Sequence, residues 1–245
     1  MLSALRKDHL LDLLATEGRI VAKDVAAALG ISEDSIRRDL RELADAGLCV
    51  RVYGGAVPVP PAEAPVTRRL QVATDSKERV ARVAVALIRP GSTIMLDAGT
   101  TTLAMARMLP DDPALTVVTP SPVVAVAVAE HSPARVLLVG GELGRHSLVA
   151  GGALALENIA RLGADVFFLG VTGADPEQGL TTGLLDDAVV KRALAARSAE
   201  TYVLASAEKV GAVSRFPVVG LDDVAGIITD PQDGSALARG WRNEL

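Results

Sequence analysis

The sequence has little cysteine, few aromatic residues and no large excess of charge of one sign. Its 245 residues include a single cysteine, Cys49, which excludes an intramolecular disulfide and disfavours a cysteine-based metal site. Phe, Trp and Tyr together make up 2% of the chain, so few side chains could stack on the bases of RNA or of single-stranded DNA. The formal net charge of -5 excludes a polybasic protein. Any contact with duplex DNA must therefore come from a local surface.

Long apolar runs are also missing. Charged residues interrupt every apolar segment before it could span a bilayer, and residues 1–8 lack the apolar core of a signal peptide. Together with the single cysteine, which suits a reducing compartment, these absences predict a cytoplasmic protein without membrane contact. With 49% hydrophobic residues, the chain is long enough to bury the cores of a small and a medium-sized domain.

The first 57 residues are expected to form three helices followed by a hairpin. Apolar residues recur at helical spacing, and each helical pattern ends at a glycine, namely Gly18, Gly30 or Gly47. Partial alternation around Gly54 and Gly55 indicates the hairpin. The expected ranges are 3–16, 23–29 and 33–46 for the helices and 48–57 for the hairpin. This order predicts a winged helix-turn-helix domain over residues 1–57.

A proline-rich stretch separates this domain from the rest of the chain. It favours an extended connection that cannot continue a helix, and we predict a linker over residues 58–66. From residue 67 to residue 245, short apolar runs alternate with helical patterns, as in a parallel sheet that is covered by helices on both faces. The second domain is therefore predicted to be α/β and Rossmann-like. The apolar runs lie at 93–96, 115–118, 135–139, 166–169, 201–204 and 224–228.

The expected third helix has an apolar side and an arginine-rich side. At about 100° per residue, Ile36, Leu40 and Leu43 fall on one side and would pack against the first two helices. Arginines at the start of such a helix suit the major groove, because they pair with guanine or bridge a phosphate. We therefore predict contacts to DNA from the N-terminal part and the exposed side of this helix and from the wing, by Ser32, Asp34, Ser35, Arg37, Arg38, Arg41, Arg51 and Tyr53.

The same arginines could instead form an ordinary solvated face. Residues 1–55 hold eight basic and nine acidic side chains, without the basic excess that DNA-binding domains often have. An adaptor that uses the third helix against another protein is a further alternative.

Residues 32–40, with Leu43, Gly47 and residues 51–56, closely resemble the DNA-binding domain of the DeoR family of bacterial repressors. The Ile-Arg-Arg-Asp-Leu core at 36–40, spaced from the Gly-Gly-Ala of the wing, is a specific signature. Tyr53 stands where the family commonly has a histidine. The resemblance implies a DNA-binding transcription regulator.

Three glycine-containing loops follow apolar runs of the second domain, and such loops line the ligand crevice of open α/β sheets. They span residues 97–102, 140–142 and 170–175. The first loop offers hydroxyl groups and backbone N–H groups at the start of a helix, which suit an anionic ligand, while Asp97 could accept hydrogen bonds from sugar hydroxyls. The alternative is that Thr100 only caps the helix.

These loops, with Lys191 and Lys209, resemble the C-terminal sensor domain of the DeoR family, which is similar in fold to ribose-5-phosphate isomerase. The resemblance extends from about Leu5 to Asp230. In the family's pattern the Asp-x-Gly-Thr-Thr loop, the Gly-Gly loop and the later lysine surround a phosphorylated sugar or related metabolite. The resemblance thus implies an effector site formed by Asp97, Gly99, Thr100, Thr101, Thr102, Gly140, Gly141, Asp175 and Lys209.

Two departures bear on the effector. The chain has Thr119-Pro120 where the family usually has Thr-Asn, and residues 206–209 read Ser-Ala-Glu-Lys where Asp-Ser-Ser-Lys is usual. The changes remove an amide and a carboxylate and add the charge of Glu208, which leaves open an effector different from the common ones. Lys209 could equally be a solvated loop residue, and Lys191, beside Asp186 and Asp187, is expected to be structural.

The leading hypothesis is a repressor of a carbohydrate-metabolism operon. A homo-oligomer, either a dimer or a tetramer, would bind double-stranded operator DNA and be released by a phosphorylated sugar or related metabolite; an activator would use the same groove chemistry. The alternative from another class is a sugar-phosphate isomerase with Asp175 as base and Lys191 or Lys209 as electrostatic stabiliser, which would leave the DNA-binding domain without a purpose. No metal-binding or nucleophile motif occurs, so we expect no metal, no cofactor and no catalytic residue.

Overall fold

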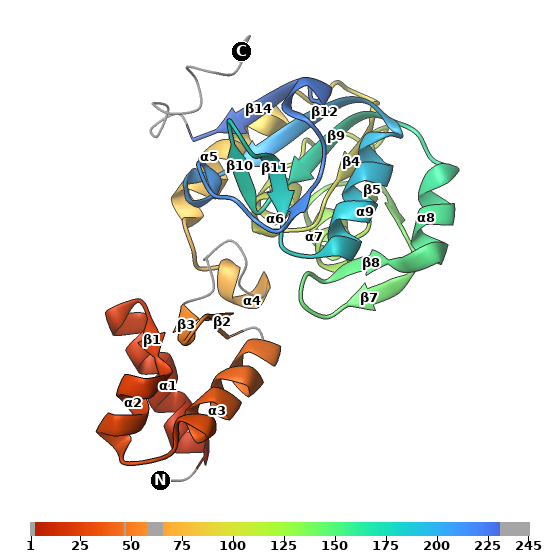
Figure 1. Cartoon of the computed structure of the whole chain (residues 1–245). Coiled ribbons are helices and arrows are strands. Elements are labelled where there is room, and N and C mark those ends of the chain that lie inside the picture. The colour runs from red at the N-terminus through yellow and green to blue at the C-terminus, as the bar shows by residue number, and fades with distance from the viewer. Residues whose placement is uncertain (1–2, 47, 58–65, 231–245) are drawn as a thin grey trace. The chain divides into compact units, whose positions relative to one another are not determined.

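A computed structural model describes residues 3–46, 48–57 and 66–230. The chain divides into two compact units, Met1–Pro65 and Val66–Leu245, and each is described by itself (Figure 1). The predicted linker at 58–66 lies outside the described residues except for Val66. That residue begins α4 (Val66–Arg69) and belongs to the second unit.

The first unit consists of three helices and a small antiparallel sheet. The helices are α1 (Ser3–Glu17), α2 (Ala22–Leu29) and α3 (Glu33–Asp45). The sheet has the order β1-β3-β2, with bounds Ile20–Val21 for β1, Val50–Val52 for β2 and Gly55–Val57 for β3. The apolar sides of the three helices enclose one core with β1 and β3, which contains Leu10, Leu14, Ile36, Leu40 and Leu43. The predicted helix-turn-helix with a wing is thus the fold of this unit.

Gly55 is required where β3 pairs with β1. A Cβ atom built on Gly55 would lie 1.7 Å from the carbonyl oxygen of Ile20, so no other residue fits without moving a strand. Gly54 precedes it at φ 80°, in the left-handed region that favours glycine. The Gly-Gly pair therefore both turns the wing and lets its second strand approach β1.

The second unit is built on a six-stranded parallel sheet with the order β14-β12-β9-β4-β5-β6 (Figure 1). Each of the six strands overlaps one of the six predicted apolar runs, and helices or short connections link them. In sheet order, the strands are β14 (Gly226–Thr229), β12 (Ser198–Ala205), β9 (Ala164–Gly170), β4 (Thr93–Leu96), β5 (Thr116–Thr119) and β6 (Arg135–Leu138).

Helices cover both faces of this sheet, because its central strands alternate two sets of apolar side chains. One core takes Ile94 and Phe168 and is covered by α5 (Thr74–Val85), α6 (Thr100–Ala106) and α7 (Pro122–His131). The other core takes Met95 and Phe167 and is covered by α8 (Gly152–Ala160) and α9 (Leu185–Ala195). The predicted fold class, a Rossmann-like α/β domain preceded by a winged helix-turn-helix, is confirmed.

Several short elements were not anticipated from the sequence. They are β1, the hairpin of β7 (Glu142–Gly144) and β8 (Val149–Gly151), the antiparallel sheet β10-β11-β13 (Gly173–Asp175, Gly179–Thr182 and Phe216–Pro217), the turns η2 (Ala207–Lys209) and η3 (Leu221–Asp223), and α4. Within the described residues, no helix combines the length and the apolar character needed to cross a bilayer.

Candidate DNA-reading face and candidate anion site

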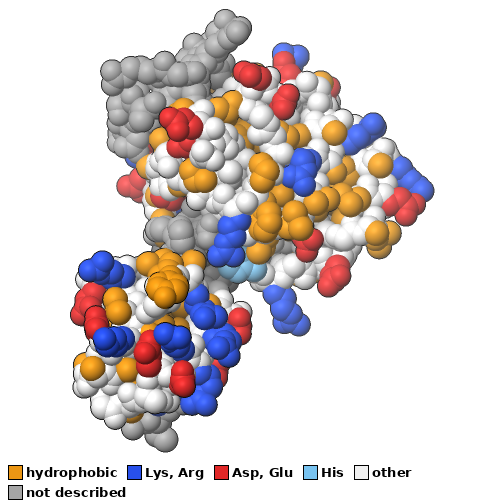
Figure 2. Space-filling model, in the orientation of Figure 1, with side chains coloured by type: hydrophobic (Ala, Val, Ile, Leu, Met, Phe, Trp, Pro, Cys, Tyr) orange, Lys and Arg blue, Asp and Glu red, His pale blue; other side chains and the backbone are white. Residues whose placement is uncertain are grey.

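Helix α3 presents the predicted arginines to solvent. Ile36, Leu40 and Leu43 are buried on its inner side, whereas Arg37, Arg38 and Arg41 are exposed on the other. Figure 2 shows Lys and Arg side chains gathered on the side of the first unit where Figure 1 places α3, with acidic side chains among them. We call the exposed residues Asp34, Arg37, Arg38 and Arg41 the reading face.

Ser32 fixes the start of α3. Its hydroxyl oxygen accepts a hydrogen bond from the backbone N–H of Ser35 at 3.3 Å and lies 2.9 Å from the Ser35 hydroxyl. As an N-cap it satisfies one of the free N–H groups of the first turn. The two serines therefore help to define the helix end that is predicted to enter the groove.

The arginines of the reading face differ in their partners. The Arg37 guanidinium donates to Glu33, one turn earlier, at 2.7 and 3.0 Å. No ion pair is recorded for Arg38 or Arg41 within the described residues. Arg38 is therefore the better candidate for a base contact, because Arg37 would have to exchange Glu33 for DNA.

Below the reading face, two ion pairs join α3 to α1. The buried carboxylate of Asp39 accepts from the Arg6 guanidinium, with 3.1 Å between Arg6 Nη2 and Asp39 Oδ1, and Lys7 pairs with Glu42. Asp39 sits within the Ile-Arg-Arg-Asp-Leu run but faces inward. Its role in that signature is to hold α3 in place.

The wing places its predicted side chains in solvent. Arg51 lies in β2 and is exposed, and Tyr53 at the tip is fully exposed. An aromatic ring that packs on nothing in the described structure is available for a partner.

In the second unit, Asp97 lies at the carboxyl end of β4 and is almost fully buried. Its Oδ1 accepts from the N–H of Ala98 at 2.7 Å and its Oδ2 from the N–H of Gly170 at 2.9 Å, while the Lys191 ammonium from α9 donates to Oδ2. Burial raises the pKa of Asp97, and the charge of Lys191 opposes that rise. The carboxylate thus ties the ends of β4 and β9 to α9, which fits the structural role expected for Lys191.

The threonines after Asp97 use their hydroxyls in different ways. Gly99, at φ 126°, is the N-cap residue of α6, so Thr100 occupies the first helical position and does not cap the helix. The hydroxyl of Thr102 donates to the Gly99 carbonyl at 3.1 Å. Thr101 accepts a hydrogen bond from the Lys209 ammonium at 3.2 Å. The loop and Lys209, far apart in sequence, therefore lie within hydrogen-bond distance of each other.

Lys209 is buried rather than solvated. Burial lowers the pKa of its ammonium to about 7; the carboxylate of Glu208 opposes this shift, and the charges of Arg69, Lys77 and Lys191 add to it. A lysine held among cations in a buried position favours an anion that would restore its charge.

Two further cations of this site, Arg69 and Lys77, were missed by the sequence analysis. The Lys77 ammonium donates to the backbone carbonyl of Arg69 at 2.7 Å and to that of Val72, and lies 3.6 Å from Glu208. Burial lowers the pKa of Arg69, while Asp187, Asp97 and Glu208 oppose that shift. Neither residue belongs to a local motif, so only the fold could reveal them.

The four cations Arg69, Lys77, Lys191 and Lys209 form what we call the cationic cluster. They come from α4, α5, α9 and η2, and they interact electrostatically with three acids, Asp97, Asp187 and Glu208. The cationic cluster thus exceeds its acidic partners by one charge when Lys209 is protonated. Together with the loop 97–102, it forms the candidate anion site.

Of Gly140 and Gly141, only Gly141 has a packing role that requires glycine. They follow β6, which lies two strands from β4 in the sheet and so roughly 10 Å away. A Cβ atom on Gly141 would lie 2.5 Å from the Gly151 carbonyl oxygen and 2.9 Å from the Ala155 Cβ. Gly141 therefore allows the loop after β6 to pack against β8 and α8.

Asp175 ends β10 and shapes a hairpin turn. Its Oδ1 accepts from the backbone N–H groups of Glu177 and Gln178 at 2.9 and 2.8 Å. The neighbouring Ala174 forms a parallel bridge with Val210, directly after Lys209. Asp175 thus lies in a segment next to η2, although its recorded hydrogen bonds are those of the turn.

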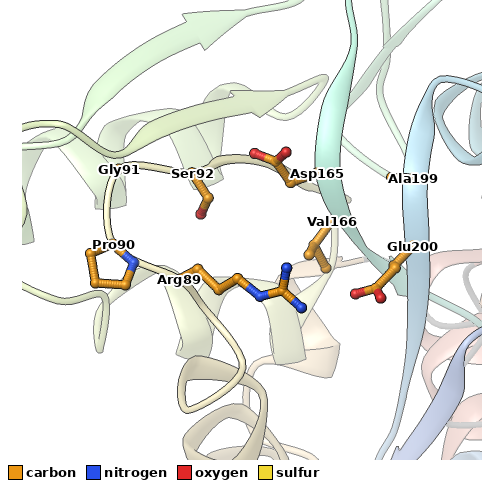
Figure 3. Close-up of a pocket in the computed structure, with 8 residues that line it drawn as sticks. All are labelled: Arg89, Pro90, Gly91, Ser92, Asp165, Val166, Ala199 and Glu200. Atoms are coloured by element: carbon orange, nitrogen blue, oxygen red, sulfur yellow. The ribbon is translucent and has the colours of Figure 1, made fainter.

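A cavity lies at the opposite end of the sheet, with a volume of 340 Å³ (Figure 3). It is formed where β4, β9 and β12 begin, and Figure 3 shows Arg89, Ser92, Asp165 and Glu200 around it. One basic and two acidic side chains give it a mixed character, unlike the cationic cluster. In the described part of the chain, no three His, Cys, Asp or Glu side chains gather into a set that could hold a metal ion.

The first unit carries exposed arginines on a helix beside a wing, and the second carries buried cations at the carboxyl end of its sheet. These two features define a class of protein: DNA-binding regulators that carry a ligand-sensing domain. The chain belongs to the DeoR family of transcriptional regulators. Residues 6–60 match the DeoR-like helix-turn-helix domain, and residues 72–231 match the DeoR C terminal sensor domain. The family and the DNA-binding regulatory function predicted from the sequence are confirmed.

Two regulators of known name are similar to this chain over almost their whole length. The HTH-type transcriptional regulator GlpR of Haloferax volcanii is 36% identical over 94% of this chain and 91% of its own. The glycerol-3-phosphate regulon repressor of Escherichia coli is 29% identical over 92% and 90%. Ribose 5-phosphate isomerase A of Methanocaldococcus jannaschii is 17% identical over 56% and 54%, with a TM-score of 0.41.

Proposed function

We propose that this regulator is a repressor whose anion site takes a small phosphorylated sugar or polyol, and that occupation of the site releases it from operator DNA. The observation that carries the proposal is the cationic cluster, in which Lys209 is buried against Thr101 among other positive charges. A phosphate dianion would supply the missing negative charge, and charge-assisted hydrogen bonds are stronger than neutral ones. The named function of the Escherichia coli relative, repression of the glycerol-3-phosphate regulon, is consistent with a ligand of this class.

The predicted site residues have separate roles in this proposal. Thr100, Thr101 and Lys209 contact the phosphate. Gly99 has no side chain and so leaves room for the ligand beside the loop. Asp97 and Lys191 position the loop, because their polar atoms are already engaged with each other. Gly140, Gly141 and Asp175 remain predicted contacts of the distal part of the ligand. The site holds its ligand without turnover, since a regulator needs only a difference in affinity between two states.

On DNA, we propose that Arg38 and Arg41 contact base edges or phosphates, with Ser32, Asp34, Ser35 and Arg37 at the helix start. Arg51 and Tyr53 extend the contact from the wing. Binding of two first units to two operator half-sites requires at least a homodimer.

The outer side of α7 is the surface we propose for the dimer. Residues 122–129 are all apolar, yet Val126 is 57% exposed, and Val123 is exposed beside it. Leu138 on the neighbouring edge strand β6 is 51% exposed and points to the same side of the sheet as Val136, which packs in the α7 core. A helix that is apolar all round is normally covered, and a second copy of the chain would supply that cover symmetrically.

The experiment that tests the repressor proposal combines DNA and ligand. Operator fragments are selected from genomic DNA with the full chain, and release of the complex is followed by fluorescence anisotropy while phosphorylated sugars and polyols are added. A releasing compound should act far more weakly without its phosphate. Thr100→Val should bind the operator normally but resist release. Equal release by the phosphorylated and unphosphorylated compounds would refute the anion site, and a monomeric full chain in sedimentation would refute the dimer.

A further inference from the structure

Two buried polar atoms at the anion site lack a hydrogen-bond partner within the described structure. One is a donor, Nε of Arg69, and the other is an acceptor, Oε2 of Glu208. Buried polar groups are nearly always paired, and each unpaired one costs stability. A donor and an acceptor left unpaired near the same cationic cluster point to a ligand that offers both kinds of group.

Glu208 is held so that one oxygen is engaged and the other is not. The Ser206 hydroxyl donates to Oε1 at 3.0 Å, and the Lys77 ammonium lies 3.6 Å from the same oxygen. The side chain is 13% exposed, so water has little access to Oε2. The fixed Oε1 leaves Oε2 as a directed acceptor, and a carboxylate acceptor selects a hydroxyl or amine donor.

Arg69 approaches the same site from the first turn of the second unit. Its Nη1 lies 4.0 Å from the position that a Cβ of Gly99 would occupy, next to the loop 97–102. Its guanidinium also interacts electrostatically with Glu208. An anion seated between this guanidinium and the Lys209 ammonium would therefore lie close to the Glu208 carboxylate. Glu208 would repel the anion unless the ligand also donated a hydrogen bond to its carboxylate.

We propose that Glu208 and Arg69 together select the ligand's chemical class: Arg69 donates to the phosphate, and Glu208 Oε2 accepts from a hydroxyl group of the same ligand. This inference rests on the proposed function. It goes beyond it by ranking bare phosphates and alkyl phosphates as weaker ligands than hydroxylated phosphates, because they satisfy Arg69 but leave Glu208 unpaired. The ligand is a phosphorylated polyol or sugar with a free hydroxyl near its phosphate.

The test uses three probes on the full chain by calorimetry: inorganic phosphate, propyl phosphate, and glycerol 3-phosphate, which differs from propyl phosphate by two hydroxyls. The wild type should bind glycerol 3-phosphate roughly tenfold or more tightly than propyl phosphate. Glu208→Gln should reduce this preference, because a neutral amide replaces the carboxylate acceptor, while binding inorganic phosphate at least as tightly as the wild type, because a repelling charge is removed. Arg69→Gln should weaken all three probes.

A matched control is Glu200→Gln, which lies in the cavity at the opposite end of the sheet (Figure 3) and should change none of these affinities. Equal affinity of the wild type for the two organic probes, or a preference that is undiminished in Glu208→Gln, would overturn the inference about Glu208. Unchanged binding in Arg69→Gln would overturn the part about Arg69. A wild type that binds none of the three phosphates would instead overturn the proposed anion site, so the two failures are distinguishable.

Discussion

Arg38 and Arg41 stand in solvent on α3, whereas Lys191 and Lys209 are each 5% exposed inside the second unit. The reading face comes from one helix of 13 residues, and its support lies directly beneath it in Asp39 and the apolar core. The cationic cluster is assembled from four elements, and its support is the sheet itself. Function at the reading face can therefore be removed without loss of fold, while most changes in the cationic cluster also change stability.

Gly55→Ala is expected to have the largest effect, and to affect the first unit but not the second. The new methyl group would collide with the Ile20 carbonyl, so β3 cannot pair with β1, and we expect a loss of at least about 4 kcal/mol in the first unit. Operator binding should disappear, while phosphate binding by the second unit stays unchanged in calorimetry. Gly54→Asn, at the neighbouring turn position, is the milder control, because asparagine tolerates positive φ. Normal operator affinity in Gly55→Ala would show that the wing is dispensable.

The converse change is Lys191→Met. It leaves the buried Asp97 carboxylate without its cation, which typically costs about 3 kcal/mol or more. The unfolding transition of the second unit should shift to lower denaturant concentration, while the transition of the first unit should not change. Adding Asp97→Asn should recover part of the loss, because the uncompensated charge is gone. If the destabilisation of the double variant equalled the sum of the two single effects, Asp97 and Lys191 would act independently, and the pairing would be contradicted.

A smaller effect, confined to function, is expected at the reading face. Arg38→Ala should weaken operator binding by about 2 kcal/mol, roughly thirtyfold, with unchanged circular dichroism and melting. Arg37→Ala should cost less, because its guanidinium is already paired with Glu33. Arg82→Ala, an exposed arginine of α5, serves as control. Wild-type affinity in Arg38→Ala would remove this residue from the interface.

The last expected effect is a pH dependence of anion binding, which requires no change in the sequence. Lys209 has a pKa of about 7 in the free protein, and an anion favours its protonated form, so binding above pH 7 must take up a proton. Affinity should therefore fall as pH rises from 6 to 9, by no more than about tenfold per unit. Sulfate is the suitable probe, because its own charge is constant in this range. Lys209→Met should bind sulfate more weakly and with a flat profile; a sloped profile in that variant would assign the proton to another group.

The same contrast explains what the sequence could predict. The inner side of α3 was predictable because Ile36, Leu40 and Leu43 repeat at helical spacing, and spacing is a local property. The sheet was predictable because parallel strands buried on both faces are continuous apolar runs. The short strands β7, β8, β10, β11 and β13 were not, since each spans only two to four residues and all but β13 include a glycine.

The candidate anion site was predictable only in part. The loop 97–102 and Lys209 were reached through the family resemblance, but Arg69 and Lys77 look like ordinary surface residues in the sequence. Lys77 is placed by contacts between α5 and η2, which join residues more than 100 positions apart. Arg69 is tied to the same place by the hydrogen bond from Lys77 to its backbone carbonyl. The engagement of Asp97 with Lys191 was equally hidden, because it depends on where α9 crosses the sheet.

The most direct test of the account is a crystal structure of the full chain grown with arsenate, located by its anomalous scattering. We expect one strong peak between Lys209, Thr100 and the Arg69 guanidinium, at the carboxyl end of β4, and no peak beside Arg89 at the opposite end of the sheet. A peak beside Arg89 with an empty cationic cluster would contradict the central claim that the buried cations form the sensing site.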